Sequence, residues 1–378
     1  MPAAPSTQLF PAVVDASTIG QRLTSAIYLP IGVEGQADTP GDATVGTLYA
    51  ISRTDEAATK FGPNSTLTRT INAILSRGAG PVISVASSKT TLPTLVQRQT
   101  AWQALESDPN VRIRLTDSEV QADIAALADS AENADLINNK QFAVVGMPSG
   151  TLKAALITGA GAVLSKRGVL VGPGVYDENG TLRGGSFAAA VVACEIAKNP
   201  DPTNDLDLTV LPRLTGVEKG ANGQSLLKQS VVAGAAVNDY EDLLQMGVSP
   251  LMPSYEPGGV MTSHLRTTWT TDSTLDALMT RIIVDQVFLD VKNYLMSGGF
   301  LRMPNSDLTR QRIQSGVSAL LEERSAWISP VVQPDSSLGY NVAATRSPDG
   351  RQVTVSYEGQ VIRGIQTVQV SGNLTITV

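Results

Sequence analysis

Short apolar runs alternate with amphipathic stretches between residues 26 and 150, and this pattern predicts strands followed by helices. One stretch carries apolar residues three and four positions apart, as on one face of a helix: Leu67, Ile71, Ile74 and Leu75. Gly78 follows as a stop signal, and the apolar segment 82–85 then predicts a strand. Because helices and strands alternate, we expect an α/β layer arrangement.

Residues 141–199 repeat this scheme. Two continuous apolar runs, Phe142–Gly146 and Gly168–Gly172, are typical of strands in a parallel sheet covered on both faces. We expect helices at 152–166 and 186–198, the second ending before a proline. The predicted fold class is α/β with mixed α+β character: a multi-domain chain of mixed sheets flanked by helices, with an extended N-terminal arm and C-terminal β-strands.

The last third of the chain predicts two helices and then strands. The longest helix is expected to begin near Asp272 and Ser273, which can cap it, and to end at Met296 before two glycines. Its apolar stripe is Leu275, Leu278, Met279, Ile282, Ile283, Phe288, Val291 and Leu295. A second helix is expected from Ser306, with the apolar residues Ile313, Val317, Leu320 and Leu321. After Trp327 the apolar period changes to two, first in Val353, Val355 and Tyr357 and later in Leu374, Ile376 and Val378.

Charge and composition exclude several classes of protein. The 378 residues carry a formal charge of -7, which argues against nucleic-acid binding because that requires clustered Lys and Arg. Of the 35 acidic and 28 basic residues, ten of each lie from His264 onward, which leaves 25 acidic and 18 basic residues before it. Every apolar run is shorter than the roughly 20 residues of a membrane span. The first residues lack the pattern of a signal peptide, so we expect folding in a cytoplasm.

Glycine motifs give weak evidence for a nucleotide site. Gly172 and Gly174 follow a strand, as in a dinucleotide-binding turn, but a third glycine is missing and Pro173 lacks an amide hydrogen. A tight turn is the better interpretation. Gly159 and Gly161 lie inside an expected helix, where close packing is the better interpretation. The sequence contains no Gly-Lys pair, so it has no phosphate-binding loop of the nucleotide-hydrolase type.

Candidates for catalysis or metal binding are equally few. His264 is the only histidine, so any serine or cysteine nucleophile would depend on it, and it lies in a strand-like stretch without a nucleophile-elbow pattern. Cys194, the only cysteine, is expected to be a small buried thiol that forms neither a disulfide nor a zinc site. The acidic loop of Asp201, Asp205 and Asp207 lacks the spacing of a calcium loop.

Several segments, in their order along the chain, resemble the contractile-tail sheath family of phages and tailocins. They are 167–173 with the alanine-rich helix 187–197, the loop 199–202, the segment 211–216, the loop 247–251, 258–260 and the Arg-Thr-Thr segment 265–268 before the long helix. The resemblance is good over residues 140–378 and loose before them. It is nearer to the compact sheaths of Mu-like myophages than to larger sheaths.

This resemblance implies a structural subunit of a virion tail, assembled in the bacterial host cytoplasm. Copies would polymerise helically around the tail tube, contact baseplate and tail terminator proteins, and contract to drive the tube through the target cell envelope. It implies neither catalysis nor a cofactor. The expected parts are an N-terminal arm (1–20), a variable outer α/β region (21–140), a conserved α/β sheath domain (141–250) and a C-terminal inner assembly domain (251–378). An α/β enzyme binding a nucleotide or small molecule near Gly172–Gly174, or another virion protein, are the alternatives.

The two ends of the chain are candidates for strand donation to neighbouring copies. An unprotected strand edge pairs readily with another chain, and the final segment alternates apolar residues with threonine without a charge or proline. The candidate residues for contact between subunits are Val13, Val14, Val368, Val370, Leu374, Ile376 and Val378. The alternative is that both ends complete the subunit's own sheet.

Overall fold

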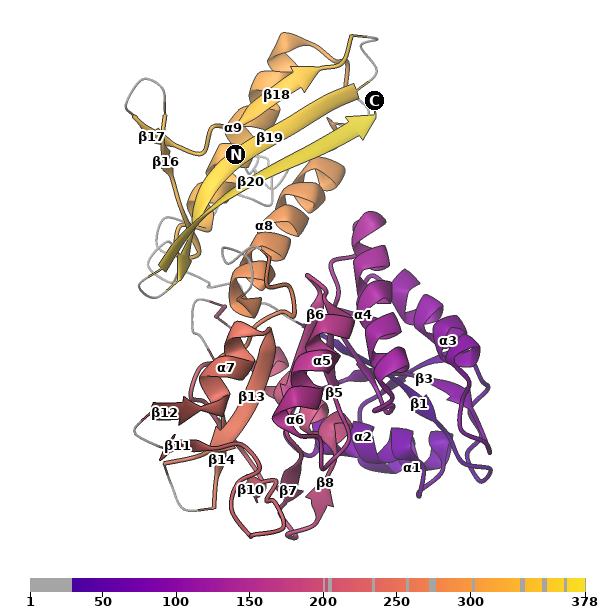
Figure 1. The fold of residues 1–378 in the computed structure, drawn as a ribbon. Helices are drawn as coiled ribbons and strands as arrows, with labels where there is room; N and C mark the ends of the chain where they lie inside the picture. Colours follow the sequence, from indigo (N-terminus) through magenta and orange to yellow (C-terminus); the bar gives the residue numbers. More distant parts are fainter. Residues whose placement is uncertain are drawn as a thin grey trace, which may run out of the picture.

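Nine strands in the described part of the chain form one sheet through the larger domain (Figure 1). This computed structural model describes residues 29–199, 201–202, 206–232, 235–255, 258–271, 277–300, 303–333, 337–348, 352–363 and 366–377, with the backbone alone for 230–232, 235–236, 363 and 366–377. The strand order is β2-β3-β1-β4-β5-β6-β13-β14-β9. Their bounds are β1 Ile31–Gln36, β2 Leu48–Ile51, β3 Val82–Ser88, β4 Ile113–Thr116, β5 Phe142–Gly146, β6 Gly168–Gly172, β9 Val210–Leu211, β13 Val248–Pro253 and β14 Val260–Thr262.

The centre of this sheet is parallel, from β3 through β1, β4, β5 and β6 to β13, and antiparallel strands add at both ends. Strands β5 and β6 are buried at every position, which confirms the expectation of a sheet covered on both faces. The expected parts 21–140 and 141–250 meet inside this sheet, because β4 pairs directly with β5.

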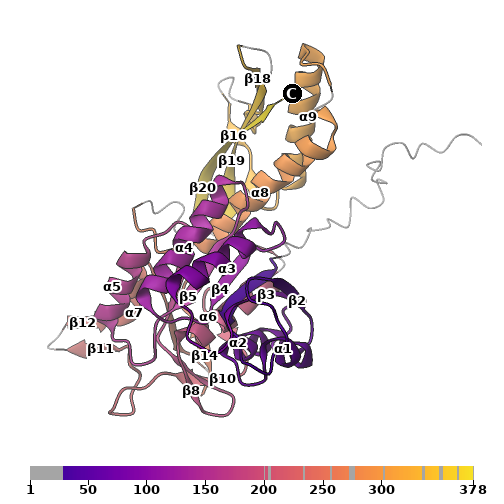
Figure 2. The same ribbon diagram turned by 90° about the vertical axis from the view of Figure 1, so that its right-hand side faces the viewer.

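Helices cover both faces of the sheet, as the two views show (Figures 1 and 2). On one face, α1 (Thr54–Phe61), α2 (Thr66–Leu75) and α6 (Gly185–Lys198) contribute to one hydrophobic core. Most of a second core lies on the other face, beneath four helices: α3 Leu95–Ser107, α4 Gln121–Leu136, α5 Lys153–Val163 and α7 Asp239–Gln245. The predicted α/β fold is therefore confirmed.

Close backbone approach explains some of the glycines. A Cβ atom on Gly146 would collide with the backbone of Gly185, so α6 begins directly against β5. In α5, a Cβ atom on Gly159 would collide with Met147, whereas Gly161 faces open space. Close packing was predicted for both α5 glycines, and it holds only for Gly159. Helix α5 also ends at Val163, before the expected residue 166.

Small sheets border the α/β domain on the side away from the C-terminal domain (Figure 1). One contains β7 (Val175–Asp177), β8 (Leu182–Arg183) and β10 (Leu214–Val217), and β11 (Gln229–Val232) pairs with β12 (Ala235–Asn238).

The C-terminal domain contains two helices and a four-stranded sheet. Helix α8 spans Leu278–Ser297 and α9 spans Asp307–Glu323. Its strands are β15 (Ile328–Ser329), β18 (Ala343–Arg346), β19 (Gln352–Arg363) and β20 (Gln366–Thr377), with the small pair β16 (Val331–Val332) and β17 (Leu338–Gly339) beside them. Most of the apolar stripe of α8 belongs to the same core as α2 and α6, so the two domains share one hydrophobic core. Phe288, which was predicted in this stripe, is only half-buried and lies outside that core, and Val287 is buried in it instead.

The two C-terminal helices test the predicted boundaries. Helix α9 begins where it was expected, directly after Ser306, whose hydroxyl caps it by accepting a hydrogen bond from the Thr309 amide at 3.2 Å. The predicted start of α8 near residue 272 is wrong, because Ala277 is still extended and the helix begins at Leu278. Asp272, Ser273 and Leu275 themselves lie outside the described residues. None of the described helices is long and apolar enough to cross a membrane.

Candidate assembly surface

The longest strands in the described part of the chain, β19 and β20, form an antiparallel hairpin of twelve residue pairs, from Gln352 opposite Thr377 to Arg363 opposite Gln366. A strand has two edges, and the second edge of β19 pairs with β18 at one end and with β15 at the other. Strand β20 therefore lies at the margin of the sheet (Figure 1). Within the described residues its outer backbone edge has no strand partner.

Burial of alternate residues holds β19 in place. Val353, Val355, Tyr357 and Val361 have exposed fractions of 4% or less, and they pack in the core to which α8 and α9 contribute. The predicted period of two is confirmed here. Removing side chains of this size from water stabilises a fold by roughly 1.5–3 kcal/mol each. The hairpin is thus anchored through β19, while β20 occupies the edge.

Part of the predicted donor set lies in this edge strand. Val368, Val370, Leu374 and Ile376 all belong to β20, and their backbones face Val361, Gly359, Val355 and Val353 of β19. Val13, Val14 and Val378 lie outside the described residues. The β20 sequence contains no charged residue and no proline, the two features that usually protect an edge from pairing with another chain.

A buried ion pair fastens α8 to the α/β domain. Arg167 directly precedes β6 and is 2% exposed, and Asp285 on α8 is 3% exposed. Both terminal nitrogens of Arg167 contact this carboxylate, with Nη2 at 2.9 Å from Oδ1. Asp135 at the end of α4 adds a second carboxylate, 3.0 Å from Nη2. The arrangement is bidentate, which makes it strong and directional.

Burial and neighbouring charges together shift the pKa values of the residues at this junction. Burial alone would lower the pKa of Arg167, but the charges of Asp285 and Asp135 more than offset it and raise the pKa above its usual value. Burial raises the pKa of Tyr357 on β19, and Asp285 adds to this shift. Asp285 therefore influences the α/β domain and the C-terminal sheet at once.

The glycine turn considered for nucleotide binding is filled by the chain itself. The Gly174 amide donates to Oε2 of Glu218 at 3.1 Å, and the Gly150 amide donates to Oε1 at 2.5 Å. Glu218 is 3% exposed. The backbone donors that could have held a phosphate already bind an internal carboxylate, so the tight-turn interpretation fits the structure.

The usual ligand position of a doubly wound sheet is also filled. This position lies between two neighbouring strands whose following connections run in opposite directions along the sheet. In this chain the two strands are β1 and β4, and the position is at their carboxyl ends. Glu34 of β1 is fully buried there and accepts hydrogen bonds from Arg98 at 2.8 Å and Trp102 at 3.1 Å. Arg98 also binds Asp117 at 2.7 Å. Burial, and then the charge of Asp117, raise the pKa of Glu34.

Sequence reasoning missed this cluster around Glu34. A charged residue inside the apolar strand Ile31–Gln36 was the available signal, because buried charges rarely occur without partners.

The remaining candidates form no reactive centre. His264 lies just after β14, rather than within a strand as expected, and its Nδ1 contacts Asp207. Cys194 is fully buried in α6, and burial raises the pKa of its thiol to about 11. Asp205 of the acidic loop lies outside the described residues. No group of three or more potential metal-binding His, Cys, Asp or Glu side chains occurs in the described part of the chain.

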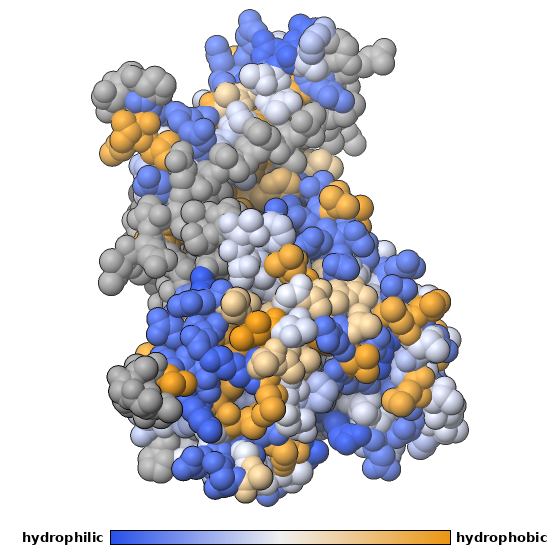
Figure 3. Space-filling view, viewed as in Figure 1, coloured by the Kyte–Doolittle hydropathy of each residue, from blue (hydrophilic) through white to orange (hydrophobic). Residues whose placement is uncertain are grey.

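Apolar and polar side chains are mixed in small groups over the face of the α/β domain seen in Figure 3. That face of the described residues shows no single broad apolar area.

Several solved structures that share this fold are described as sheath proteins. The sheath tail protein of Desulfitobacterium hafniense is 13% identical with a TM-score of 0.68, covering 93% of this chain and 97% of the other. The sheath tail protein Lin1278 of Listeria innocua is 11% identical, with a TM-score of 0.65 and coverage of 94% and 97%. The helical sheath of the anti-feeding prophage in its contracted state is 14% identical, with a TM-score of 0.62 and coverage of 93% and 91%.

No protein-family model matches the sequence, and no curated protein matches it. The likeness is thus one of structure over nearly the whole of each chain, at low sequence identity. The chain has the tail sheath fold, which confirms the resemblance at the level of the fold.

Proposed function

We propose that this chain is the structural subunit of a contractile tail sheath. It polymerises helically around a tail tube and contracts to drive the tube through the target cell envelope. The observation that carries the proposal is the match of fold over 93% of this chain and 97% of a solved sheath tail protein. The carboxylates that fill both ligand positions support a structural role over the alternative of a nucleotide-binding enzyme.

The open edge of β20 supports assembly by shared strands. Main-chain hydrogen bonds to a neighbouring strand would satisfy the unpaired groups of this edge without a change of fold. In the proposed assembly, strands from the chain ends of one copy extend the sheet of the next. Contacts of this head-to-tail kind generate helical filaments when the rotation does not close.

We infer that the C-terminal domain and the N-terminal arm face the tube, and that the acidic part of the chain before residue 250 faces outward. The distribution of charge supports this orientation, since the whole acidic excess lies before His264. Baseplate and terminator proteins would contact the two ends of the assembly, and the whole would lie in a virion tail made in the host cytoplasm. A map of the assembly with residues 30–130 against the tube would overturn this orientation.

Negative-stain electron microscopy of the purified protein tests the proposal. A sheath subunit should form tubes or stacked rings whose yield rises with protein concentration. A monodisperse globular particle at every concentration would contradict it and favour the enzyme. A closed shell would instead favour another virion protein.

A further inference from the structure

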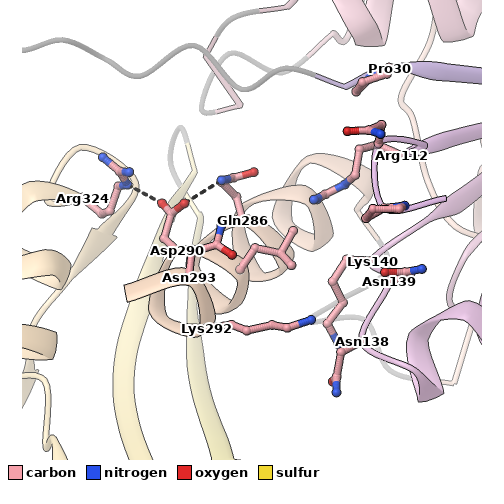
Figure 4. A pocket seen from close by; sticks show the side chains of 13 residues that line it. Pro30, Arg112, Asn138, Asn139, Lys140, Gln286, Asp290, Lys292, Asn293 and Arg324 are labelled. Atoms are coloured by element: carbon pink, nitrogen blue, oxygen red, sulfur yellow. Dashed lines mark hydrogen bonds and ion pairs between the residues drawn. The ribbon is translucent and has the colours of Figure 1, made fainter. Parts of the chain in front are cut away.

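A polar cleft lies between the α/β domain and α8, with a volume of about 450 Å³ (Figure 4). Pro30, Arg112 and Lys140 line it from the α/β side, and Gln286, Asp290 and Lys292 line it from α8. Arg324 also lines the cleft. Neither ligand position of the α/β sheet forms part of this cleft.

Arg112 is the unexplained group of the cleft. It precedes β4 and is 9% exposed, yet its guanidinium group makes no hydrogen bond or ion pair with any described residue. Its Nε atom is buried without a partner. Burial lowers the pKa of Arg112, as desolvation of an unpaired cation should. Native proteins rarely leave a buried charge unpaired, so this side chain points to a ligand outside the described chain.

The charges around Arg112 show what kind of ligand is missing. The single carboxylate of the lining, Asp290, already accepts hydrogen bonds from Arg324 and Gln286, both at 2.7 Å (Figure 4). Lys140 contacts Asp135 and lies 4.2 Å from the Phe288 ring centre. Lys292 has no hydrogen-bond or ion-pair partner among the described residues. Two cations on opposite walls, Arg112 and Lys292, therefore make no ion pair with a carboxylate of the described residues, although the charges of Asp285 and Asp290 act on Arg112 from a distance.

We propose that this cleft receives a carboxylate side chain from a neighbouring copy of the chain. The inference rests on the proposed function, which places copies in contact. The chain as a whole supplies carboxylates in excess, 35 against 28 basic residues. A guanidinium group pairs a carboxylate in a bidentate manner, and a pair formed only on assembly makes the contact between copies specific. The cleft is thus an electrostatic contact between copies, separate from the strand edge of β20.

The substitution Arg112→Gln tests this contact, because it should leave the subunit at least as stable as before and weaken assembly. Arg112→Gln removes an unpartnered buried charge, so the isolated subunit should unfold at the same or a higher temperature than the wild type. Assembly should weaken, with the protein concentration needed for tubes rising about tenfold or more at low salt, because a buried partner is lost. Arg69→Gln makes the same charge change at an exposed position of α2 and should alter neither property.

A variant that destabilises the subunit would give Arg112 a role inside the chain and overturn the proposal. Unchanged assembly would overturn it as well. Binding of inorganic phosphate or citrate to the subunit, abolished by Arg112→Gln without effect on assembly, would assign the cleft to a free anion and also overturn it.

Zero-length cross-linking identifies the partner directly. Tubes grown from a mixture of ¹⁴N-labelled and ¹⁵N-labelled subunits are treated with a carbodiimide, which joins an amine to a touching carboxylate with loss of water. We expect mixed-isotope peptides that link Lys292 to an Asp or Glu of another copy. Tubes that yield links from Lys292 only within one copy would contradict this inference and leave the proposed function intact. The absence of tubes would overturn both.

Discussion

The buried pair between Arg167 and Asp285 makes a sharp prediction, because it is the polar link between two domains. Asp285→Asn keeps the shape of the side chain and removes its charge. Arg167, 2% exposed, then keeps only Asp135, whose side chain is 35% exposed. Removing one partner of a buried ion pair typically costs 3–5 kcal/mol, since the other charge stays buried. Because Asp135 still neutralises part of the Arg167 charge, we expect the free energy of unfolding to fall by about 3 kcal/mol.

Urea unfolding measures this loss, with a probe in each domain. Trp102 lies in α3 and Trp327 lies directly before β15, so tryptophan fluorescence follows both domains. Asp307→Asn is the matched control, because its pair with Arg310 is exposed at the aspartate, and such pairs contribute less than about 1 kcal/mol. If Asp285→Asn lowers the free energy of unfolding no more than this control does, the buried pair does not join the two domains.

A second variant separates charge from packing at the same place. Arg167→Met combined with Asp285→Leu removes both charges and keeps the volume approximately. Replacing a buried pair by apolar residues is often neutral or stabilising, so this double variant should recover most of the 3 kcal/mol. A double variant as unstable as Asp285→Asn would show that the geometry of the hydrogen bonds, rather than the unpaired charge, determines the loss.

Three further predictions concern other parts of the chain. Deleting residues 366–378 should leave a folded, soluble subunit that forms no tubes by electron microscopy; normal tubes, or an unfolded subunit by circular dichroism, would contradict donation of this strand. Burial raises the pKa of the Cys194 thiol to about 11, and the unfolded thiol ionises near 9, so its contribution to stability is lost as pH rises between these values. Relative to Cys194→Ala, the wild type should lose about 1.4 kcal/mol of unfolding free energy per pH unit there, and parallel curves would refute this. Glu218→Ala should cost about 1–3 kcal/mol in thermal unfolding, because the buried Gly174 amide and the Gly150 amide lose their acceptor, and an unchanged melting temperature would refute this role.

Local patterns in the sequence predicted helices and strands well where residues close together in the sequence determine them. The start of α9 at Ser306, the helix α2 and the buried strands β5 and β6 follow from spacing within a few residues. The start of α8 did not, because Asp272 and Ser273 are good caps by residue type and the first turn is set instead by extended backbone at Ala277.

Long-range pairing was beyond the same patterns. Arg98 and Glu34 are 64 positions apart, and Arg167 and Asp285 are 118 positions apart. Nothing in local periodicity says which charge meets which across that distance. The neighbour of β6 in the sheet is β13, roughly 80 residues later along the chain. The sequence therefore indicated the layers of the fold, but not the polar contacts that fix one layer against another.

These polar contacts favour a subunit that moves as one body. A doubly wound sheet usually keeps an open crevice that closes on a ligand, whereas here Glu34 and Glu218 fill the positions at which a ligand would act. Helix α8 shares a core with the α/β domain and is tied to it by Asp285, so a hinge between the domains would expose apolar surface and a buried charge together. In the proposed assembly, contacts at the β20 edge and in the cleft at Arg112 join different copies, so they can change while the shared core and the pair of Arg167 and Asp285 stay intact. In a sheath built from this chain, we therefore expect contraction to rearrange the contacts between copies while each copy keeps its fold.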